Sequence, residues 1–509
     1  MIAKVHSAVL QGIDAVECEV EADVSRGGVG EIKLVGLAEA AVKESVSRIQ
    51  AALRNSGYRW PGPKVTINLA PADLRKESSA LDLPIALAVA MAGGELVSEK
   101  ARQYVFLGEL ALDGRVRPIK GALASAMLAA RTKRTGIVLP AANAAEAAVV
   151  EEVQAIPVSS LTEAIGFLTD ELPIEPACVD LEEIFRVAGR YDVDFGDVRG
   201  QEAAKRALTV AAAGHHNILM IGPPGSGKTM LAKRIPTILP PLSREESLET
   251  TRVYSARGLL EPGQSLLAVR PVRTPHHSSS SAALVGGGVI PQPGEVSLAH
   301  HGVLFLDEFP EFSRPTLEMI RQPLEDGCVT IPRVHSTLRF PAAIMLVAAM
   351  NPCPCGYYTD PKRRCKCSPL MIERYVGRVS GPLIDRIDIH VEVPPVPWKQ
   401  LRGDDGGASS QQMRDQVVAA RARQRERFGR GSTTTNATMS SRQIRQHCRL
   451  SPEGEALLKQ AMMEMGLSAR AHDKVLRIGR TIADLDAADA VAPHHLAEAI
   501  QYRRLDRKL

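Results

Sequence analysis

The run Gly222-Pro-Pro-Gly-Ser-Gly-Lys228-Thr229 constrains the fold of this chain more than any other segment. It matches the pattern GxxxxGK[ST], and it lies between an apolar run, 218–221, and a segment of helical character. In that arrangement, glycines let backbone N–H groups surround phosphates at the N-terminus of a helix. The pattern assigns Lys228 to the β- and γ-phosphates and Thr229 to Mg²⁺. We therefore predict ATP and Mg²⁺ as cofactors, bound by Gly222, Pro223, Pro224, Gly225, Ser226, Gly227, Lys228 and Thr229.

Two further apolar runs end in polar side chains. The run 303–306 is followed by Asp307 and Glu308. In such a pair, one carboxylate can bind Mg²⁺ and the other can act on the attacking water. The run 344–349 leads to Asn351, at the edge of the sheet where open α/β folds bind ligands. We expect Asp307 to hold Mg²⁺, Glu308 to polarise the water and Asn351 to orient it. The other interpretation of Asn351 is a turn cap.

Hydrolysis of a γ-phosphate also needs a cation that stabilises the transition state. We choose Arg386, in the run Gly381-Pro-Leu-Ile-Asp-Arg386-Ile-Asp388, and Arg470, in the run Leu467-Ser-Ala-Arg470. The alternative is that both are solvated surface residues, as most arginines are.

The length of 509 residues requires more than one hydrophobic core. Residues 1–171 mix strand-like and helix-like periodicity, as at 64–69 and 42–53, and predict an α+β domain. A Pro- and acid-bearing linker, 172–197, precedes a domain at 198–395 in which apolar strands alternate with helical segments, the pattern of a parallel sheet. Residues 396–509 predict an all-α lid. The expected fold class is multidomain α/β.

Composition excludes little. Hydrophobic residues make up 45% and charged residues 24%, which is ordinary for a globular protein, and the net charge of +4 neither demands nor excludes nucleic acid. No secretory signal and no apolar run of about 18 residues is visible, so we expect a cytoplasmic protein without a membrane partner. The eight cysteines are therefore expected to be reduced or metal-bound.

Four cysteines form two CxC pairs, Cys353/Cys355 and Cys365/Cys367. Nine residues with several basic side chains separate the pairs, which predicts a compact loop with four thiols at its base. Tetrahedral Zn²⁺ suits such a set in a reducing compartment. Redox-active thiols and unligated thiols remain as alternatives.

The order of these motifs resembles AAA+ ATPases of the magnesium-chelatase-like branch. The runs Thr274-Pro-His-His-Ser278, Pro293-Gly-Glu-Val-Ser-Leu-Ala-His300 and Asn351-Pro-Cys-Pro-Cys-Gly356 resemble the ComM/YifB family in particular. The resemblance implies that Arg386 is presented to the ATP of a neighbouring subunit and that Arg470 is the lid sensor. It also implies a hexameric ring and DNA branch migration during recombination of incoming DNA.

The amino-terminal part resembles the proteolytic domain of Lon, a ribosomal S5 domain 2-like fold, through the run Phe106-Leu-Gly-Glu-Leu-Ala-Leu-Asp-Gly-Arg-Val-Arg-Pro-Ile119. Asp82 stands where the resemblance places the nucleophilic serine, and the run 121–126 offers no lysine. A Ser–Lys dyad needs both members, so we expect a domain without peptidase activity. Ser78 and Ser79 keep an ATP-dependent protease open as a rival function.

Two segments are candidates for touching DNA. A long insertion before Asp307 resembles a hairpin that projects into the pore of the ring, and a second candidate hairpin covers 330–339. Neither contains the aromatic tripeptide of protein-threading rings, which favours nucleic acid over polypeptide. The expected contacts are Arg270, Arg273, His276, His277, Arg333, His335 and Arg339, and the alternative role for each is at a subunit interface. The runner-up function is a protein- or metallation-remodelling ATPase of the chelatase type.

Overall fold

The computed structural model describes residues 2–25, 31–37, 40–76, 78–187, 189, 191–288, 290–332, 337–358, 360, 363–398, 400, 407–429 and 432–503. The chain divides into two compact units. The first contains Met1–Ala188 and Ser243–Ala268, and the second contains Gly189–Leu242 and Val269–Leu509.

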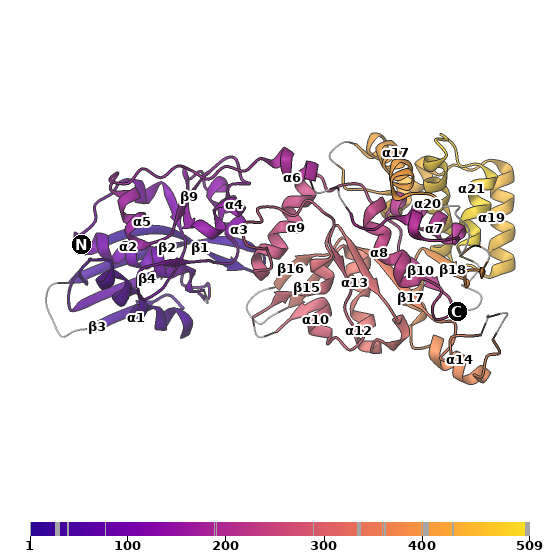
Figure 1. Ribbon diagram of the computed structural model, residues 1–509, viewed down its shortest axis with the longest axis horizontal. Coiled ribbons are helices and arrows are strands. Elements are labelled where there is room, and N and C mark those ends of the chain that lie inside the picture. Colours follow the sequence, from indigo (N-terminus) through magenta and orange to yellow (C-terminus); the bar gives the residue numbers. More distant parts are fainter. Residues whose placement is uncertain are drawn as a thin grey trace. The chain divides into compact units, whose positions relative to one another are not determined.

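The first unit is built on a seven-stranded mixed sheet in the order β3-β4-β2-β1-β5-β8-β9 (Figure 1). A tight turn at Gly12 pairs β1 with β2 as an antiparallel hairpin, and β4 lies antiparallel on the far side of β2. The remaining strands join by parallel pairing. The bounds are β1 (Ile2–Gln11), β2 (Asp14–Ser25), β3 (Glu31–Val35), β4 (Lys64–Ala70), β5 (Tyr104–Phe106), β8 (Gly136–Pro140) and β9 (Gln154–Val158).

Helix α2 (Asp82–Gly93) is the centre of this unit's core. Its apolar residues are buried on every side of the helix, because it packs against β1 and β2 and also against α1 (Ala40–Asn55). In β4, Val65, Ile67 and Leu69 are buried and alternate with partly exposed residues, as expected for a sheet with one covered face. The other elements are α3 (Ala122–Arg131), α4 (Ala141–Ala147), α5 (Leu161–Leu168), α6 (Leu181–Val187) and the short pair β6 (Glu109–Leu110) and β7 (Val116–Arg117).

Helix α9 (Arg244–Arg257) also belongs to the first unit, although it follows the glycine-rich loop in sequence. Leu248 and Leu266 join the apolar cluster that contains the buried face of α3. Two ion pairs hold the helix, Arg244 with Glu151 at 2.8 Å and Arg252 with Asp14 at 3.0 Å. The sequence bounds placed this segment inside 198–395, whereas its contacts group it with the first unit.

The second unit contains a five-stranded parallel sheet in the order β11-β14-β17-β10-β18. Every residue of β10, β14 and β17 is buried, as in parallel sheets covered on both faces. The predicted multidomain α/β fold with a parallel sheet is therefore confirmed. The strands are β10 (Ile218–Ile221), β11 (Val272–Arg273), β14 (Val303–Leu306), β17 (Met345–Met350) and β18 (Ile389–Glu392).

Helices from the carboxy-terminal part share one apolar cluster with this sheet, including Val417, Val475 and Leu496. Asp388 adds a polar link, since its carboxylate lies 3.0 Å from Lys474 Nζ and accepts the N–H of Asn217 at 3.0 Å. The helices of the unit are α7 (Glu202–Gly214), α8 (Lys228–Ile238), α10 (Ser281–Val285), α11 (Glu295–Leu298), α12 (Arg314–Met319), α13 (Arg321–Asp326), α14 (Pro369–Val376), α15 (Gly381–Ile384), α17 (Ser410–Phe428), α18 (Ser441–His447), α19 (Pro452–Met465), α20 (Ala469–Leu485) and α21 (Pro493–Gln501).

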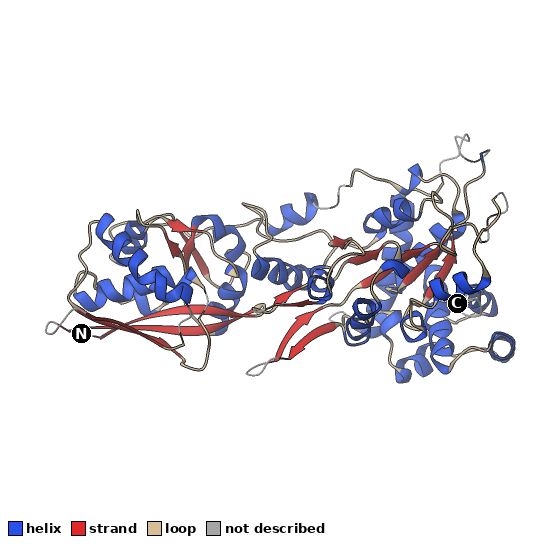
Figure 2. Ribbon diagram, turned by 90° about the horizontal axis from the view of Figure 1, so that it is seen from below, coloured by secondary structure: helices blue, strands red, loops and turns tan. Residues whose placement is uncertain are grey.

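Two small hairpins complete the second unit. One pairs β12 (Gly286–Gly287) with β13 (Gln292–Pro293), and the other pairs β15 (Cys328–Pro332) with β16 (Thr337–Pro341). The strands of the second hairpin extend beyond the helices next to them (Figure 2). Across the part of the chain that the structure describes, no helix has the length and apolar character needed to span a membrane.

Candidate nucleotide-hydrolysis site

The glycine-rich loop joins the end of β10 to the start of α8, as its sequence pattern predicts. A Cβ at Gly222 would lie 2.1 Å from the carbonyl oxygen of Val393, so no larger residue fits there. Gly227 has a φ of 94°, in the region that favours glycine. The loop therefore directs its backbone toward the N-terminus of α8, the favoured place for a phosphate.

Lys228 is buried at the base of this loop. Its ammonium donates to the carbonyl oxygens of Gly222 at 2.7 Å and Pro223 at 3.0 Å, and to Oδ1 of Asn351 at 3.2 Å. Burial lowers the pKa of Lys228, and the charge of Asp307 opposes that shift. One cation and one amide, from α8 and from the end of β17, thus meet at the same edge of the sheet.

Thr229 and Asp307 form the candidate magnesium site. The Thr229 hydroxyl donates to Oδ2 of Asp307 at 2.7 Å, which brings the start of α8 to the end of β14. A hydroxyl and a carboxylate are hard oxygen ligands, and Mg²⁺ is usually held by one or two such side chains together with waters and substrate phosphates. The residues present therefore fit Mg²⁺.

Glu308 follows in a left-handed backbone conformation, with φ of 51° and ψ of 45°. Its N–H donates to Oδ1 of Asp307 at 2.9 Å, and its Oε2 lies 3.2 Å from Nδ1 of His277. The sequence predicted His277 as a DNA contact and missed this neighbour. The conspicuous run 274–278 was the signal, but a run of residues does not reveal which side chain faces it.

Arg386 and Arg470 converge on one carboxylate. Arg386 donates to the Pro382 carbonyl at 2.6 Å and pairs with Glu325, while Arg470 Nη2 lies 3.8 Å from the same Glu325 oxygen. The side chain of Arg386 is 10% exposed and that of Arg470 is 62% exposed. Glu325, in α13, is a residue that sequence reasoning missed, because only the fold brings α13 beside both arginines.

The candidate DNA contacts have partners of several kinds. Arg270 donates to the carbonyls of Pro240 at 2.7 Å and His301 at 2.7 Å, and Arg273 makes a bidentate pair with Glu295 at 2.6 and 2.8 Å. His276 contacts Ser278 at 2.8 Å, and the exposed Arg339, on β16, donates to Sγ of Cys328 at 3.1 Å. Arg333 and His335 lie outside the described residues. Contact with DNA stays a prediction for all of them.

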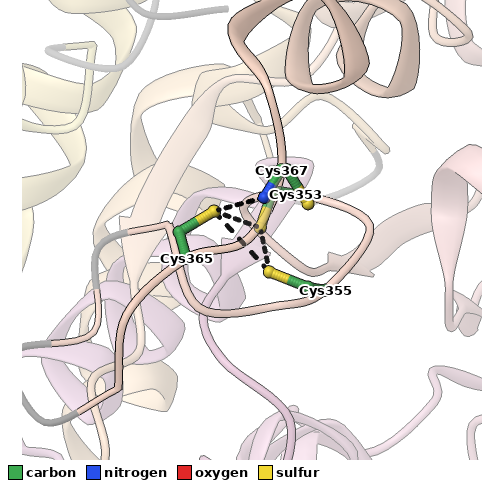
Figure 3. Close-up of side chains that lie close together, drawn as sticks. All are labelled: Cys353, Cys355, Cys365 and Cys367. Carbon is green, nitrogen blue, oxygen red and sulfur yellow. Dashed lines mark hydrogen bonds between the residues drawn. The ribbon is translucent and has the colours of Figure 1, made fainter.

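The four cysteines of the two CxC pairs come together after β17 (Figure 3). Their sulfur atoms all lie within 4.8 Å of one another, and Cys353 is buried. The structure thus brings together the whole set that the sequence singled out.

In the first unit, Asp82 begins α2 and is fully buried. It pairs with Arg48 at 3.1 Å and accepts the N–H of Leu110 at 3.3 Å. Burial raises the pKa of Asp82 to about 6, against the opposing effect of Arg48. In the segment that would supply the lysine of a dyad, Ser125 donates to the Gly121 carbonyl at 2.9 Å. A buried, ion-paired carboxylate is not a hydroxyl nucleophile, and the lack of peptidase activity in this unit stays a prediction.

Three family models cover most of the chain. Residues 194–401 match "Magnesium chelatase, subunit ChlI", residues 20–143 match "Subunit ChlI of Mg-chelatase", and residues 407–503 match "Magnesium chelatase, subunit ChlI C-terminal". These matches make the chain an ATPase of the AAA+ class, with ATP and Mg²⁺ as cofactors and assembly into an oligomer.

Relatives extend the similarity over the full length. Competence protein ComM of Haemophilus influenzae is 42% identical over 513 residues, which cover 100% of this chain and 98% of that protein. YifB of Salmonella typhimurium is 42% identical over 510 residues, with the same two shares. Lon protease 2 of Bacillus subtilis is 31% identical over 145 residues, or 26% of this chain and 25% of that protein. The chain therefore belongs to the ComM/YifB family of magnesium-chelatase-like AAA+ ATPases.

Proposed function

We propose that this protein is a cytoplasmic ring motor, most simply a hexamer, that couples ATP hydrolysis to movement on branched or single-stranded DNA during recombination of incoming DNA. The observation that carries the proposal is the full-length likeness to a protein named for competence, combined with a complete set of hydrolytic side chains. Competence is the uptake of DNA, so a motor in that process has nucleic acid as its natural substrate.

Each side chain of the site has a task in this proposal. Thr229 and Asp307 would hold Mg²⁺, which neutralises charge on the phosphates. Lys228 binds the phosphates, Glu308 orients the water and accepts its proton, and Asn351 positions the water beside Lys228. Arg386 of one subunit stabilises the transition state at its neighbour, with Glu325 holding the guanidinium in place.

The hairpin of β15 and β16 is the proposed DNA-facing element. It extends from the second unit and carries the exposed Arg339. An exposed guanidinium suits phosphate oxygens, which position nucleic acid without reading its sequence. Arg270 and Arg273, which already bind carbonyl and carboxylate oxygens of the chain, would act on DNA by shaping the loop that carries His276.

The test is the rate of ATP turnover with no DNA, single strands, duplex and four-way junctions. We expect at least one DNA to raise turnover, and the stimulation to fall as salt rises, because phosphate contacts release counterions. Glu308→Gln should lower turnover by about 10²-fold or more. Glu426→Gln, an exposed change on α17, is the matched control and should behave as wild type. Turnover that no DNA alters would overturn the DNA assignment and leave the ATPase standing.

A second candidate is a chelatase-type motor that remodels a protein or assists metal insertion, favoured by the three matching models named for magnesium chelatase. The same assay separates the two functions. DNA leaves the turnover of such a motor unchanged, while its protein partner raises it.

A further inference from the structure

The two CxC pairs that follow β17 bring their four sulfur atoms close together. Sγ of Cys353 lies 3.4 Å from that of Cys355 and 3.8 Å from that of Cys365, and the last two sulfurs are 3.6 Å apart. Cys367 completes the group within 4.8 Å. Figure 3 shows the four side chains close together, with dashed lines joining the sulfur atoms of Cys353, Cys355 and Cys365.

The sulfur–sulfur distances can be compared with those of a zinc site, a disulfide and an iron–sulfur cluster. A zinc ion with four thiolates at about 2.3 Å in a tetrahedron separates neighbouring sulfurs by about 3.8 Å. A disulfide joins sulfurs at about 2.05 Å, far shorter than any pair in this group. A polynuclear iron–sulfur cluster would hold its thiolates farther apart than one ion does. The spacing thus fits a single tetrahedral ion.

The surroundings fit a negatively charged centre. Four thiolates around Zn²⁺ carry a net charge of −2, and backbone N–H groups offset part of it. The N–H of Cys367 donates to Sγ of Cys365 at 3.4 Å, and backbone N–H groups of Lys366 and Tyr357 donate to Cys355. Arg363, Arg364 and Lys366 add exposed positive side chains on the same loop. Such outer contacts orient the ligands of metal sites.

The cluster also lies against the nucleotide loop. Gly356, next to Cys355, has a φ of 82°, and a Cβ there would lie 2.4 Å from Cδ of Pro224. Asn351, which accepts from Lys228, precedes Cys353 by two residues. A metal that joins the four cysteines would therefore hold two parts of the ATP site in place. One is the glycine-rich loop at Pro224, and the other is the backbone that carries Asn351.

We propose that Cys353, Cys355, Cys365 and Cys367 bind one structural Zn²⁺, and that the closed loop supports Pro224 and Asn351 in the geometry that binds ATP. The site is coordinatively complete with four thiolates, so it takes no part in the chemical step. Its effect on hydrolysis passes through the positions of Asn351 and the glycine-rich loop.

The first experiment measures metal in the purified full-length chain. We expect about one zinc per chain, and Co²⁺ substituted for it should give the absorption of a tetrahedral thiolate site. The double variant Cys365→Ser/Cys367→Ser should lose the zinc, whereas Cys178→Ser, an exposed cysteine elsewhere, should keep it. Wild-type protein without zinc, or with iron and sulfide in its place, would overturn the site. Should the double variant not fold, the zinc content and cobalt spectrum of the wild type decide.

The second experiment tests the link to ATP. Removing the zinc with a chelator should weaken binding of a fluorescent ATP analogue by about tenfold, and restoring Zn²⁺ should recover it. Gly356→Ala should keep its zinc and still bind the analogue more weakly, since the new Cβ pushes on Pro224. Unchanged nucleotide affinity in zinc-free protein would overturn the supporting role. Because neither readout involves DNA, both results are independent of the proposed motor substrate.

Discussion

Glu308 has a backbone conformation that few residues other than glycine adopt, with a φ of 51°. The preceding Asp307 accepts its N–H, and His277 approaches its carboxylate. A strained backbone conformation thus sets the orientation of the Glu308 carboxylate, and such strain is common at functional sites. We infer from this geometry that His277 is a positioning residue for Glu308.

We expect His277→Gln to lower kcat for DNA-free ATP hydrolysis by about tenfold while KM changes little. The change disturbs the direction of Glu308 and leaves in place Lys228 and Thr229, the residues proposed to bind nucleotide. Steady-state kinetics give the two constants, and His472→Gln, on α20, is the matched control. A rise in KM at constant kcat would contradict the positioning role.

Glu325 offers a second prediction at this scale, because it is the shared partner of Arg386 and Arg470. Glu325→Gln keeps the shape of the side chain and removes its charge. We expect turnover to fall in the assembled protein, with ATP affinity of isolated chains unchanged, since Arg386 is proposed to act on a neighbour's nucleotide. Turnover and equilibrium binding, measured side by side, check this. Glu318→Gln, which loses a comparable pair with Arg321, serves as the control.

At the residue scale, the sequence predicted those site residues whose motif determines their relative positions. Thr229, at the start of α8, and Asp307, directly after β14, belong to motifs with a known spatial relation, and the structure brings their side chains to 2.7 Å. Glu325 and the Glu308 contact of His277 depend on how loops return to the sheet. No local pattern encodes such contacts, so they could not be predicted.

Among elements, the buried parallel strands were predictable and the short ones were not. The apolar runs at 218–221 and 303–306 became β10 and β14 with the expected bounds. Strand β11 has two residues, too few for any periodicity, and its place at the sheet edge comes from pairing with β14. Strand order is likewise set by contacts between distant segments, which periodicity does not report.

Asp388 links β18 to the lid helix α20 through Lys474 and His216. Burial alone would raise the pKa of Asp388, but the charge of Lys474 and the hydrogen bond with His216 outweigh it and hold the pKa below its usual range. Burial also lowers the pKa of His216. Groups with depressed folded pKa values stabilise the fold above their unfolded values, about 6.5 for His and 3.9 for Asp. Their contribution is lost as pH falls through the folded values.

We therefore expect wild-type protein to lose stability steadily as pH drops below about 6.5. Asp388→Asn should lower the free energy of unfolding by about 3–5 kcal/mol at pH 7.5, because it leaves the Lys474 charge buried without its partner. Urea unfolding at several pH values measures both effects. Asp489→Asn, whose carboxylate is exposed, should match wild type. A variant as stable as wild type would show that the cluster does not hold the lid.

At the scale of the whole molecule, the chain forms two hydrophobic cores, and segments of the first and second unit alternate along the sequence. The segment Ser243–Ala268 leaves the second unit after α8, packs in the first and returns at Val269. Its apolar residues look the same in sequence whichever core they enter, so composition along the chain did not indicate the exchange. The connection between α8 and β11 therefore contributes its apolar residues to the core of the first unit.

Leu266→Ala tests this arrangement. Leu266 is 3% exposed and clusters with Leu123 and Leu128 of α3. The cavity should cost about 2–5 kcal/mol. Because the lost contacts lie in the first unit, hydrogen exchange should accelerate in α3, far from residue 266 in sequence. Leu208→Ala, an equally buried change in α7, should instead accelerate exchange in the second unit. Faster exchange after Leu266→Ala confined to the strands of the parallel sheet would mean that the segment belongs to the nucleotide-binding core.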